Sequence, residues 1–293
     1  MSRIPAVVHV DVDGFTDIAR GHGWTIDDGP DTIFESGLRA LLELFAEADV
    51  TATFFTVANS LDDPRKADLL REAVRGGHEI ASHTVSHQLL LDASVDEART
   101  EIFESRDRLE QGLQTPVTGF RAPGYQIDRR GVELLEEAGY RWDSSVFPTD
   151  AFATRLEAPV EDLTRPGRPF SGLDLCEVPL PDHRPGPFPT TPSYALLLGH
   201  PYFSWGLRRA VSRARPFVLL YHLIDVADPL PASRLSGWKQ KVFTLSNRSA
   251  ETKRHRCRIM LNQVQAACDL TSTSALLDGT VGSGTPGSEP ADG

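Results

Sequence analysis

The chain has 293 residues, of which 40% are hydrophobic, and it carries a formal net charge of −11 at pH 7. This length is enough for one large α/β domain or two small ones, with a sizeable core that needs no disulfides. The acidic charge argues against a nucleic-acid-binding protein. The longest apolar runs are much shorter than the ~20 residues that a membrane span requires, so we expect no transmembrane helix.

The N-terminal residues and the cysteines bear on the cellular compartment. Met1-Ser2-Arg3-Ile4-Pro5 leads directly into a strand-like run, without the basic and then apolar pattern of a signal peptide. Cys176, Cys257 and Cys268 are an odd number of cysteines, and their spacing is not that of a metal site. We therefore expect reduced thiols in a cytoplasmic protein.

Strand-like and helix-like segments alternate along the chain. Residues 6–12 read as a buried, valine-rich strand, and residues 31–48 read as a helix because its leucines fall on one face. Further strands are expected at residues 50–57, 79–82, 117–120, 140–142 and 217–221, and further helices at 66–75, 94–110 and 128–139. This alternation predicts a parallel α/β fold, and polar clusters after the strands suggest a barrel with its active site at the strands' carboxyl ends.

Two segments are expected to lie outside the regular elements. Residues 150–192 are rich in proline and glycine and read as loops. Residues 279–293 are rich in Gly, Ser and Pro and read as a disordered tail. We therefore expect one domain over residues 1–278.

The first polar cluster, Asp11 and Asp13, ends the first predicted strand. Alternate residues of an extended segment point the same way, so the two carboxylates share a face. They would repel each other unless a metal or an arginine neutralised them. A turn built from Asp and Gly is the structural alternative.

The second cluster is the pair His83 and His87, which follows the strand predicted at residues 79–82. Histidines at positions i and i+4 meet on one face of a helix or turn, which is the spacing of zinc ligands. The pair alone is weak evidence, but its placement after a strand strengthens it. Two histidines and one carboxylate suit a divalent transition metal with positions left open for water.

Three more polar groups follow predicted strands: Arg121, Asp143 and His222. Arg121 could pair with a catalytic carboxylate, and the Pro123-Gly124 loop could turn backbone N–H groups toward an oxyanion. Each group has a structural alternative, a surface turn or a lone structural histidine. Five polar groups, each placed after a predicted strand, are hard to attribute to chance.

Taken in order, these motifs resemble the polysaccharide deacetylase superfamily (NodB homology, carbohydrate esterase family 4) over residues 6–225. The series is Asp11-Val-Asp-Gly, Ala52-Thr-Phe-Phe, Gly77-His-Glu-Ile, His83-Thr-Val-Ser-His, Arg121-Ala-Pro-Gly-Tyr, Trp142-Asp-Ser-Ser and His222. The resemblance implies an incomplete or distorted (β/α) barrel that holds one divalent metal, most often zinc, with cobalt, nickel or manganese as alternatives.

The resemblance also implies roles for individual residues. Asp13, His83 and His87 would be the metal ligands; Asp11 would be the general base, steadied by Arg121, and His222 the general acid. Apart from the resemblance, we infer from its position three residues after His222 that Asp225 orients this histidine. The substrate or the oxyanion would be met by Pro123, Gly124, Tyr125 and Asp143, with a backbone N–H near Tyr125 as the oxyanion donor.

Two features depart from the commonest form of the family. The first motif here is Asp-Val-Asp-Gly, not Thr-Phe-Asp-Asp-Gly, and this form resembles a branch with allantoinase-like proteins, atypical peptidoglycan deacetylases and lipid-linked aminosugar deformylases. In addition, Thr25-Ile-Asp-Asp-Gly-Pro, which contains Asp28, looks like the commoner motif. The segment before it is a poor buried strand, so we favour Asp11 and Asp13.

The resemblance predicts a hydrolase that removes an acetyl or formyl group from an amino sugar, such as a lipid-linked or nucleotide-linked precursor in polysaccharide or envelope synthesis. An amidohydrolase of cyclic ureides or imides and a non-catalytic carbohydrate-binding relative are the alternatives. Residues 194–215 place aromatics beside arginines, which suits either peripheral membrane contact or, as we favour, a helix packed on the barrel. Glu177 and Asp182 are candidates for substrate contacts, although solvated loop positions are favoured for both.

Overall fold

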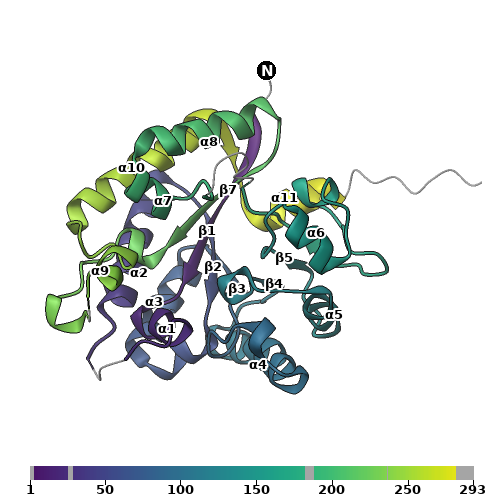
Figure 1. The fold of residues 1–293 in the computed structure, drawn as a ribbon, viewed down its shortest axis with the longest axis horizontal. Coiled ribbons are helices and arrows are strands. Elements are labelled where there is room, and N and C mark those ends of the chain that lie inside the picture. The colour runs from purple at the N-terminus through teal and green to yellow at the C-terminus, as the bar shows by residue number, and fades with distance from the viewer. Residues whose placement is uncertain (1–2, 26–28, 182–187, 236, 282–293) are drawn as a thin grey trace, which may run out of the picture.

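The fold is built around β1 (Ile4–Val12), a valine-rich strand that is buried along almost its whole length. The computed structural model describes residues 3–25, 29–181, 188–235 and 237–281 (Figure 1). Parallel strands flank β1 in the order β6-β5-β4-β3-β2-β1-β7, and β8 pairs with the first residues of β1. The flanking strands are β2 (Ala52–Thr56), β3 (Glu79–Ser82), β4 (Gly119–Phe120), β5 (Trp142–Asp143), β6 (Cys176–Glu177), β7 (Phe217–His222) and β8 (Cys268–Leu270).

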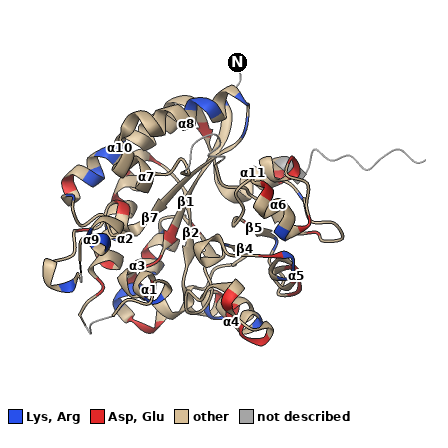
Figure 2. Ribbon diagram, in the orientation of Figure 1, with Lys and Arg blue, Asp and Glu red and all other residues tan. Residues whose placement is uncertain are grey.

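Helices surround this curved sheet (Figure 1). The α-helices are α1 (Phe15–Gly21), α2 (Thr32–Ala48), α3 (Pro64–Arg75), α4 (Val95–Leu113), α5 (Arg129–Glu137), α6 (Asp150–Leu156), α7 (Pro192–Leu198), α8 (His200–Ser212), α9 (Trp238–Phe243), α10 (Ala250–Ala267) and α11 (Thr273–Val281). Short 3-10 turns are η1 (Ala58–Asp62), η2 (Leu90–Asp92), η3 (Pro123–Tyr125), η4 (Asp162–Thr164), η5 (Leu223–Asp225) and η6 (Ala232–Arg234). Figure 2 marks Lys, Arg, Asp and Glu positions along many of these helices.

The predicted fold class is confirmed, because the parallel sheet curls into a barrel whose two end strands, β6 and β7, are not paired with each other among the described strands. Every strand and helix expected between residues 6 and 142 is present, with bounds shifted by a few residues. The expectation of loops over residues 150–192 was wrong in part. Short elements α6 and β6 form there because Leu156 and Cys176 bury their side chains in the core.

The C-terminal part of the chain completes the inside of the barrel. β8 lies against β1, and α11 follows it with Leu276 and Leu277 buried. These leucines join an apolar cluster with Val7, Phe55 and Trp142, which is separate from the larger core between the sheet and the helices. Helix α11 includes the first residues of the expected tail; residues 282–293 lie outside the described part of the chain.

Because the strands are parallel, their carboxyl ends all lie at one edge of the sheet. Asp11, His83, Arg121 and His222 therefore converge there although they are far apart in the sequence. Among the described residues, no helix has the length and apolar character needed to cross a membrane.

Candidate active site

The predicted polar residues surround one cavity of about 520 Å³ at the carboxyl ends of the strands. Its lining includes five of the predicted ionisable side chains together with part of the η3 turn: Asp11, Asp13, His83, His87, His222, Gly124 and Tyr125. Arg121, Pro123 and Asp143 are buried but are not among the lining residues. The structure thus brings the predicted residues together in two groups. One group lines the cavity, and the other forms a buried supporting layer behind it.

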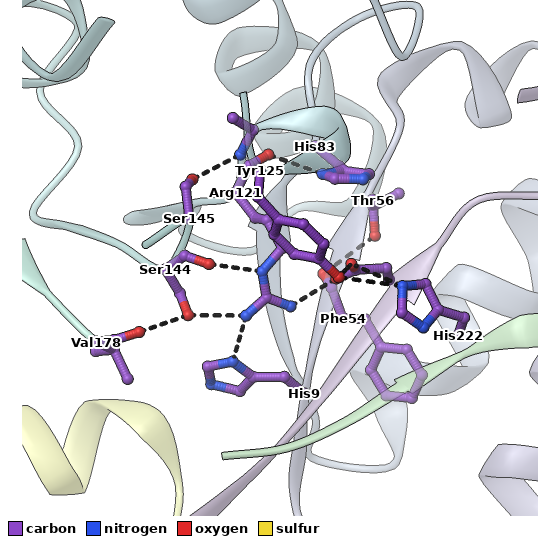
Figure 3. A network of polar contacts seen from close by, with 12 residues as sticks. His9, Phe54, Thr56, His83, Arg121, Tyr125, Ser144, Ser145, Val178 and His222 are labelled. Carbon is purple, nitrogen blue, oxygen red and sulfur yellow. Dashed lines mark hydrogen bonds and ion pairs between the residues drawn. The ribbon is translucent and has the colours of Figure 1, made fainter. Parts of the chain in front are cut away.

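Arg121 is the centre of the supporting layer (Figure 3). Its side chain has no exposed surface, and its Nη1 lies 2.6 Å from Asp11 Oδ1. Nε donates to Ser144 O at 2.7 Å, and Nη2 contacts Ser144 Oγ and His9 Nδ1, each at 2.8 Å. The guanidinium also lies 3.8 Å from the centroid of the Phe55 ring. A buried guanidinium is stable only when its N–H groups are paired in this way.

The electrostatics of Asp11 follow from this contact. Burial alone would raise the pKa of Asp11, but Arg121, with smaller contributions from His83 and His222, lowers that pKa to about 2. The carboxylate is therefore ionised over the whole physiological range. Its Oδ1 is taken by Arg121, while Oδ2 faces the cavity.

His222 faces Asp11 across the cavity. His222 Nε2 lies 3.5 Å from Asp11 Oδ2 and 3.2 Å from the Tyr125 hydroxyl, which donates to the same Asp11 oxygen at 3.3 Å. On the other side of the ring, Nδ1 lies 3.2 Å from Ser193 Oγ, whose hydrogen goes to Asp225 Oδ1 at 2.7 Å. Both ring nitrogens therefore face oxygen atoms whose own hydrogens point elsewhere.

Asp225 positions His222 indirectly. One carboxylate oxygen accepts the backbone N–H of His222 at 2.9 Å, and the other holds Ser193. Sequence reasoning assigned the orienting role to Asp225 but missed Ser193, which lies between the loops expected over residues 150–192 and the segment 194–215. Alternation along β1 could have found His9, since it lies two residues before Asp11 and shares its face.

Asp13, His83 and His87 lie in the same cavity. His83 and His87 come together in a loop, not on a helix face, with ring centroids 5.0 Å apart. Thr84 and His87 have positive φ values of 68° and 63°, which turn this loop back on itself. Such backbone conformations cost free energy for residues with side chains and are concentrated at functional sites.

The donor chemistry of these three residues fits a divalent metal. Burial, together with the neighbouring His83, lowers the pKa of His87 to about 3, so the ring is neutral, as a ligand must be. Asp13 Oδ1 and His87 Nδ1 are both buried without a hydrogen-bond partner. His83 Nδ1 contacts Arg121 O at 2.7 Å, which leaves Nε2 free to bind an ion.

The arrangement is not that of a closed metal site. In the part of the chain that the structure describes, no three His, Cys, Asp or Glu side chains are grouped so that they could hold a metal ion as they stand. Burial raises the pKa of Asp13 to about 7, with the charges of Asp11 and Asp17 adding to the effect.

Gly14, which follows Asp13, allows the chain to turn closely past α2. A Cβ atom at this position would lie 2.1 Å from Asp31 Oδ2. Asp31 caps α2 by accepting the Phe34 N–H and also accepts the Phe15 N–H at 2.9 Å. The glycine of the first motif is therefore required by packing at the site.

The η3 turn contributes a side chain where a backbone donor was expected. The Tyr125 N–H donates to Ala122 O at 2.9 Å, so this N–H is engaged within the turn and does not face the cavity as an oxyanion donor. The Tyr125 hydroxyl, by contrast, contacts Asp11 and His222. The Gly124 φ of 58° allows the turn to present this side chain.

Asp143 and Glu177 form a buried pair of carboxyl groups on adjacent strands, β5 and β6. Burial raises the pKa of Asp143 to about 6 and, with the charge of Asp143, raises the pKa of Glu177 well above its ordinary value. Asp143 holds Ser145, whose hydroxyl accepts the Ala122 N–H at 2.8 Å. The solvated position favoured for Glu177 was wrong, since its side chain is fully buried; Asp182 lies outside the described residues.

The competing motif cannot be placed in the same way. Asp27 and Asp28 lie outside the described residues, whereas Asp11 and Asp13 line the cavity with both histidines.

An incomplete parallel barrel with ionisable side chains gathered at the carboxyl ends of its strands is the arrangement of the (β/α)-barrel class of enzymes. Sequence comparison identifies the family: the model for polysaccharide deacetylases matches residues 20–142. A chitooligosaccharide deacetylase from Sinorhizobium fredii is 31% identical over 163 residues, which are 54% of this chain and 72% of that protein. The chain belongs to the polysaccharide deacetylase family.

Other relatives are matched over shorter stretches. A peptidoglycan-N-acetylglucosamine deacetylase from Bacillus cereus is 29% identical over 117 residues, and a peptidoglycan deacetylase from Helicobacter pylori is 25% identical over 147 residues. These matches cover 40% and 48% of this chain, and 52% and 49% of the two relatives. The chain thus spans about half the length of each of these two proteins.

Solved structures support the fold. A putative polysaccharide deacetylase from Mycobacterium smegmatis superposes with a TM-score of 0.66 at 20% identity, covering 100% of this chain and 96% of that one. The allantoinase Puue superposes with a TM-score of 0.64 at 14% identity, covering 96% and 91% of the two chains. A pseudoenzyme of carbohydrate esterase family 4 from Bacillus anthracis gives 0.52 at 13% identity, covering 95% and 70%. Since proteins with and without activity share this barrel, the fold alone does not decide the function.

The Arg121–Asp11 contact makes a prediction about stability. Replacing Arg121 with Met leaves the Asp11 carboxylate buried without its guanidinium partner, so the free energy of unfolding should fall by about 3–5 kcal/mol in urea titrations. The control is Arg99→Met, which breaks an exposed ion pair with Glu137 and should cost less than about 1 kcal/mol. Equal losses in the two variants would contradict the assigned importance of Arg121.

The Asp143–Glu177 pair predicts a pH dependence. Both pKa values are raised in the folded state, so stability is lost as pH rises from about 4, the ordinary carboxyl pKa, through 6 and above. Glu177→Gln removes one ionisation and should reduce the loss of unfolding free energy between pH 5 and pH 8 by about 1 kcal/mol. Glu137→Gln, at an exposed carboxyl group, should follow the wild-type curve. A Glu177→Gln curve parallel to wild type would disprove the pairing.

Proposed function

We propose that this chain hydrolyses the amide bond of an N-acylated amino sugar and releases acetate or formate. The observation that carries this proposal is the placement of Asp11 Oδ2 and His222 Nε2 3.5 Å apart in a cavity that also contains Asp13, His83 and His87. Membership of the polysaccharide deacetylase family supports deacetylation as the class of reaction.

Asp11 is the proposed general base. Arg121 keeps its carboxylate ionised and fixes one oxygen, so the other oxygen is available to orient a water molecule. As the water oxygen bonds to the acyl carbon, Asp11 accepts the proton. The Tyr125 hydroxyl, which contacts the same carboxylate oxygen, helps to hold it toward the substrate.

His222 is the proposed general acid. Its two nitrogens face Ser193 Oγ and the Tyr125 hydroxyl, whose hydrogens are directed to Asp225 and Asp11, so a doubly protonated ring can donate on both sides. When the C–N bond breaks, proton transfer from His222 to the nitrogen makes the amine a better leaving group.

Asp13, His83 and His87 would hold one divalent ion, with zinc expected and cobalt, nickel or manganese as alternatives. The bound ion would polarise the acyl carbonyl and make water a stronger nucleophile at neutral pH. The buried, unpartnered atoms of Asp13 and His87 support this assignment.

The metal assignment is tested by elemental analysis of zinc-loaded protein. We expect about one zinc per chain in wild type and its loss in His83→Ala, His87→Ala and Asp13→Asn. His255→Ala, at an exposed histidine, and Asp28→Ala should keep the metal. Asp11→Asn should also keep it, while kcat on tetra-N-acetylchitotetraose falls by roughly 10²–10⁴.

Other results would point to the alternatives. Metal retained in Asp13→Asn but lost in Asp28→Ala would transfer the ligand role to the competing motif. Hydrolysis of allantoin or succinimide in place of the sugar would indicate a cyclic amidohydrolase. A protein that binds the oligosaccharide without metal or turnover would be a non-catalytic carbohydrate-binding relative.

The cavity walls favour a substrate with an apolar part. Besides the polar groups, the lining contains a set of large apolar or aromatic side chains: Ile18, Leu89, Phe147, Tyr194, Leu197, Ile224 and Phe243. A wall of this kind binds apolar surface near the reacting amide. We therefore favour a lipid-linked amino sugar over a wholly hydrophilic polymer.

The rim of the cavity supports peripheral contact with a lipid surface. Leu197, Leu198 and Phe243 are 40%, 49% and 44% exposed, and Trp238, which shares α9 with Phe243, is 71% exposed. The exposed Lys239 and Lys241 flank them on α9. Residues 194–215, expected as one segment, are two helices, and α8 buries Phe203 and Leu207 against the fold. We therefore propose α7 and α9 as the helices that would contact the lipid surface.

Vesicle co-sedimentation tests this contact. Binding to phosphatidylglycerol vesicles should weaken several-fold in Leu198→Ser and Trp238→Ser, because each removes exposed apolar surface at the rim. Trp205→Ser, on α8, is the control and should bind like wild type. Wild-type binding at background would remove the membrane proposal without affecting the proposed hydrolase activity.

A further inference from the structure

A chain of buried polar contacts runs from Arg121 through the inside of the barrel, away from the cavity. His9 Nδ1 lies 2.8 Å from Arg121 Nη2, and His9 Nε2 lies 3.0 Å from Thr273 Oγ1. The Thr273 hydroxyl is 2.7 Å from Thr53 Oγ1, which donates to Glu79 Oε2 at 2.8 Å. His9, Thr53 and Thr273 are at most 1% exposed.

The direction of these hydrogen bonds is fixed from both ends. A guanidinium only donates, so His9 Nδ1 accepts from Arg121 and the ring proton is on Nε2. His9 Nε2–H then donates to Thr273 Oγ1. At the other end, Thr53 gives its hydrogen to Glu79, so Thr273 must donate to Thr53. One tautomer of His9 satisfies every group in the chain.

Other surroundings of His9 agree with a neutral ring. Burial and the charge of Arg121 lower the pKa of His9 well below its ordinary value, with only Asp11 acting in the opposite direction. Phe55 and Trp142 lie beside it, with ring centroids 5.0 Å and 6.1 Å away. A ring packed in this way has little freedom to rotate.

We propose that His9 and Thr273 are positioning residues for the active site: Thr273 accepts the Nε2–H of His9 and holds the ring in place, so that His9 Nδ1 fixes the guanidinium of Arg121 and directs its Nη1 at Asp11. Thr273 is the first residue of α11, and its backbone N–H donates to Glu79 Oε2 at 3.1 Å. The C-terminal segment, which lies outside residues 20–142, thus supports the proposed base from behind.

The part of this inference that concerns catalysis rests on the proposed role of Asp11 as the base. A small displacement of a catalytic group costs rate more than binding, because it acts on the geometry of the reacting atoms. Loss of the Thr273 hydroxyl should therefore lower kcat and leave KM almost unchanged.

The tautomer is tested by ¹⁵N NMR of histidine-labelled zinc-loaded protein, with the His9 signals identified from their absence in His9→Gln. We expect a neutral ring with Nε2 protonated and Nδ1 accepting a hydrogen bond, and in Thr273→Val a shift of these signals. A doubly protonated ring, or a proton on Nδ1 in wild type, would overturn the proposal. This measurement needs no substrate, so it is independent of the proposed hydrolase activity.

The kinetic test uses tetra-N-acetylchitotetraose and matched variants. Thr273→Val, which keeps the shape but removes the hydroxyl, should lower kcat about tenfold with KM within about twofold. Thr273→Ser keeps the hydroxyl and should retain wild-type kcat, as should Ser274→Ala, whose hydroxyl contacts Glu79 but not His9. Wild-type kcat in Thr273→Val, or an equal loss in Thr273→Ser, would overturn the positioning role.

A second pair of variants covers the case in which Thr273→Val does not fold. His9→Gln keeps an oxygen that can accept from Arg121, whereas His9→Leu does not, so His9→Gln should retain the larger part of the wild-type kcat. Equal kcat in the two variants would contradict the proposal. If wild type hydrolyses neither the oligosaccharide nor a lipid-linked N-acylated amino sugar, the proposed function fails, and the NMR result alone decides whether Thr273 holds the His9 ring.

Discussion

Arg121 brings a full positive charge into the barrel, and the geometry of the site depends on how that charge is paired. Its partners come from two strands or their ends: Asp11 and His9 from β1, and Ser144 from the end of β5. The ion pair between Arg121 and Asp11 can form only when β4, β5 and β1 occupy their correct places and registers in the curved sheet. A shift of register by one residue in β1 would turn both His9 and Asp11 to the other face of the sheet. The same register that fills the barrel with apolar side chains therefore sets the position of the proposed base.

Around this ion pair, the barrel contains several groups that lower the free energy of unfolding. Asp13, Asp143 and Glu177 are all buried carboxyl groups with raised pKa values, and Thr84 and His87 adopt left-handed backbone conformations in the site loop. Each lowers stability relative to an apolar or unstrained alternative. They lie in or behind the site at the carboxyl edge of the sheet, while Leu276, Leu277 and their apolar neighbours form a separate cluster inside the barrel.

Much of this arrangement follows from local sequence. Valine-rich β1, the leucine stripe of α2 and the capping box at Ser94 act over a few residues, so they predicted the first strands and helices with small errors in their bounds. The convergence of Asp11, His83, Arg121 and His222 also followed, since parallel strands must place their carboxyl ends together. The roles of Ser193 and Thr273 could not be predicted, because each depends on a hydrogen bond to a histidine that is far away in the sequence. The loop at His87 could not be predicted either, because the spacing of the two histidines does not indicate a left-handed backbone conformation.

The barrel is shared by proteins that include an allantoinase and a pseudoenzyme, so the proposed catalysis rests on the polar network and not on the fold. A buried ion pair is often no more stabilising than apolar side chains of the same volume, so stability alone gives no reason to retain one. In this chain the pair lies beside His222, Tyr125 and Ser193, none of which contacts the Arg121 guanidinium. Their contacts around Asp11 Oδ2 support the proposed role of Asp11 as the base. The C-terminal contact at Thr273 extends this reasoning, because it adds a further buried polar chain whose other end is the guanidinium that holds Asp11.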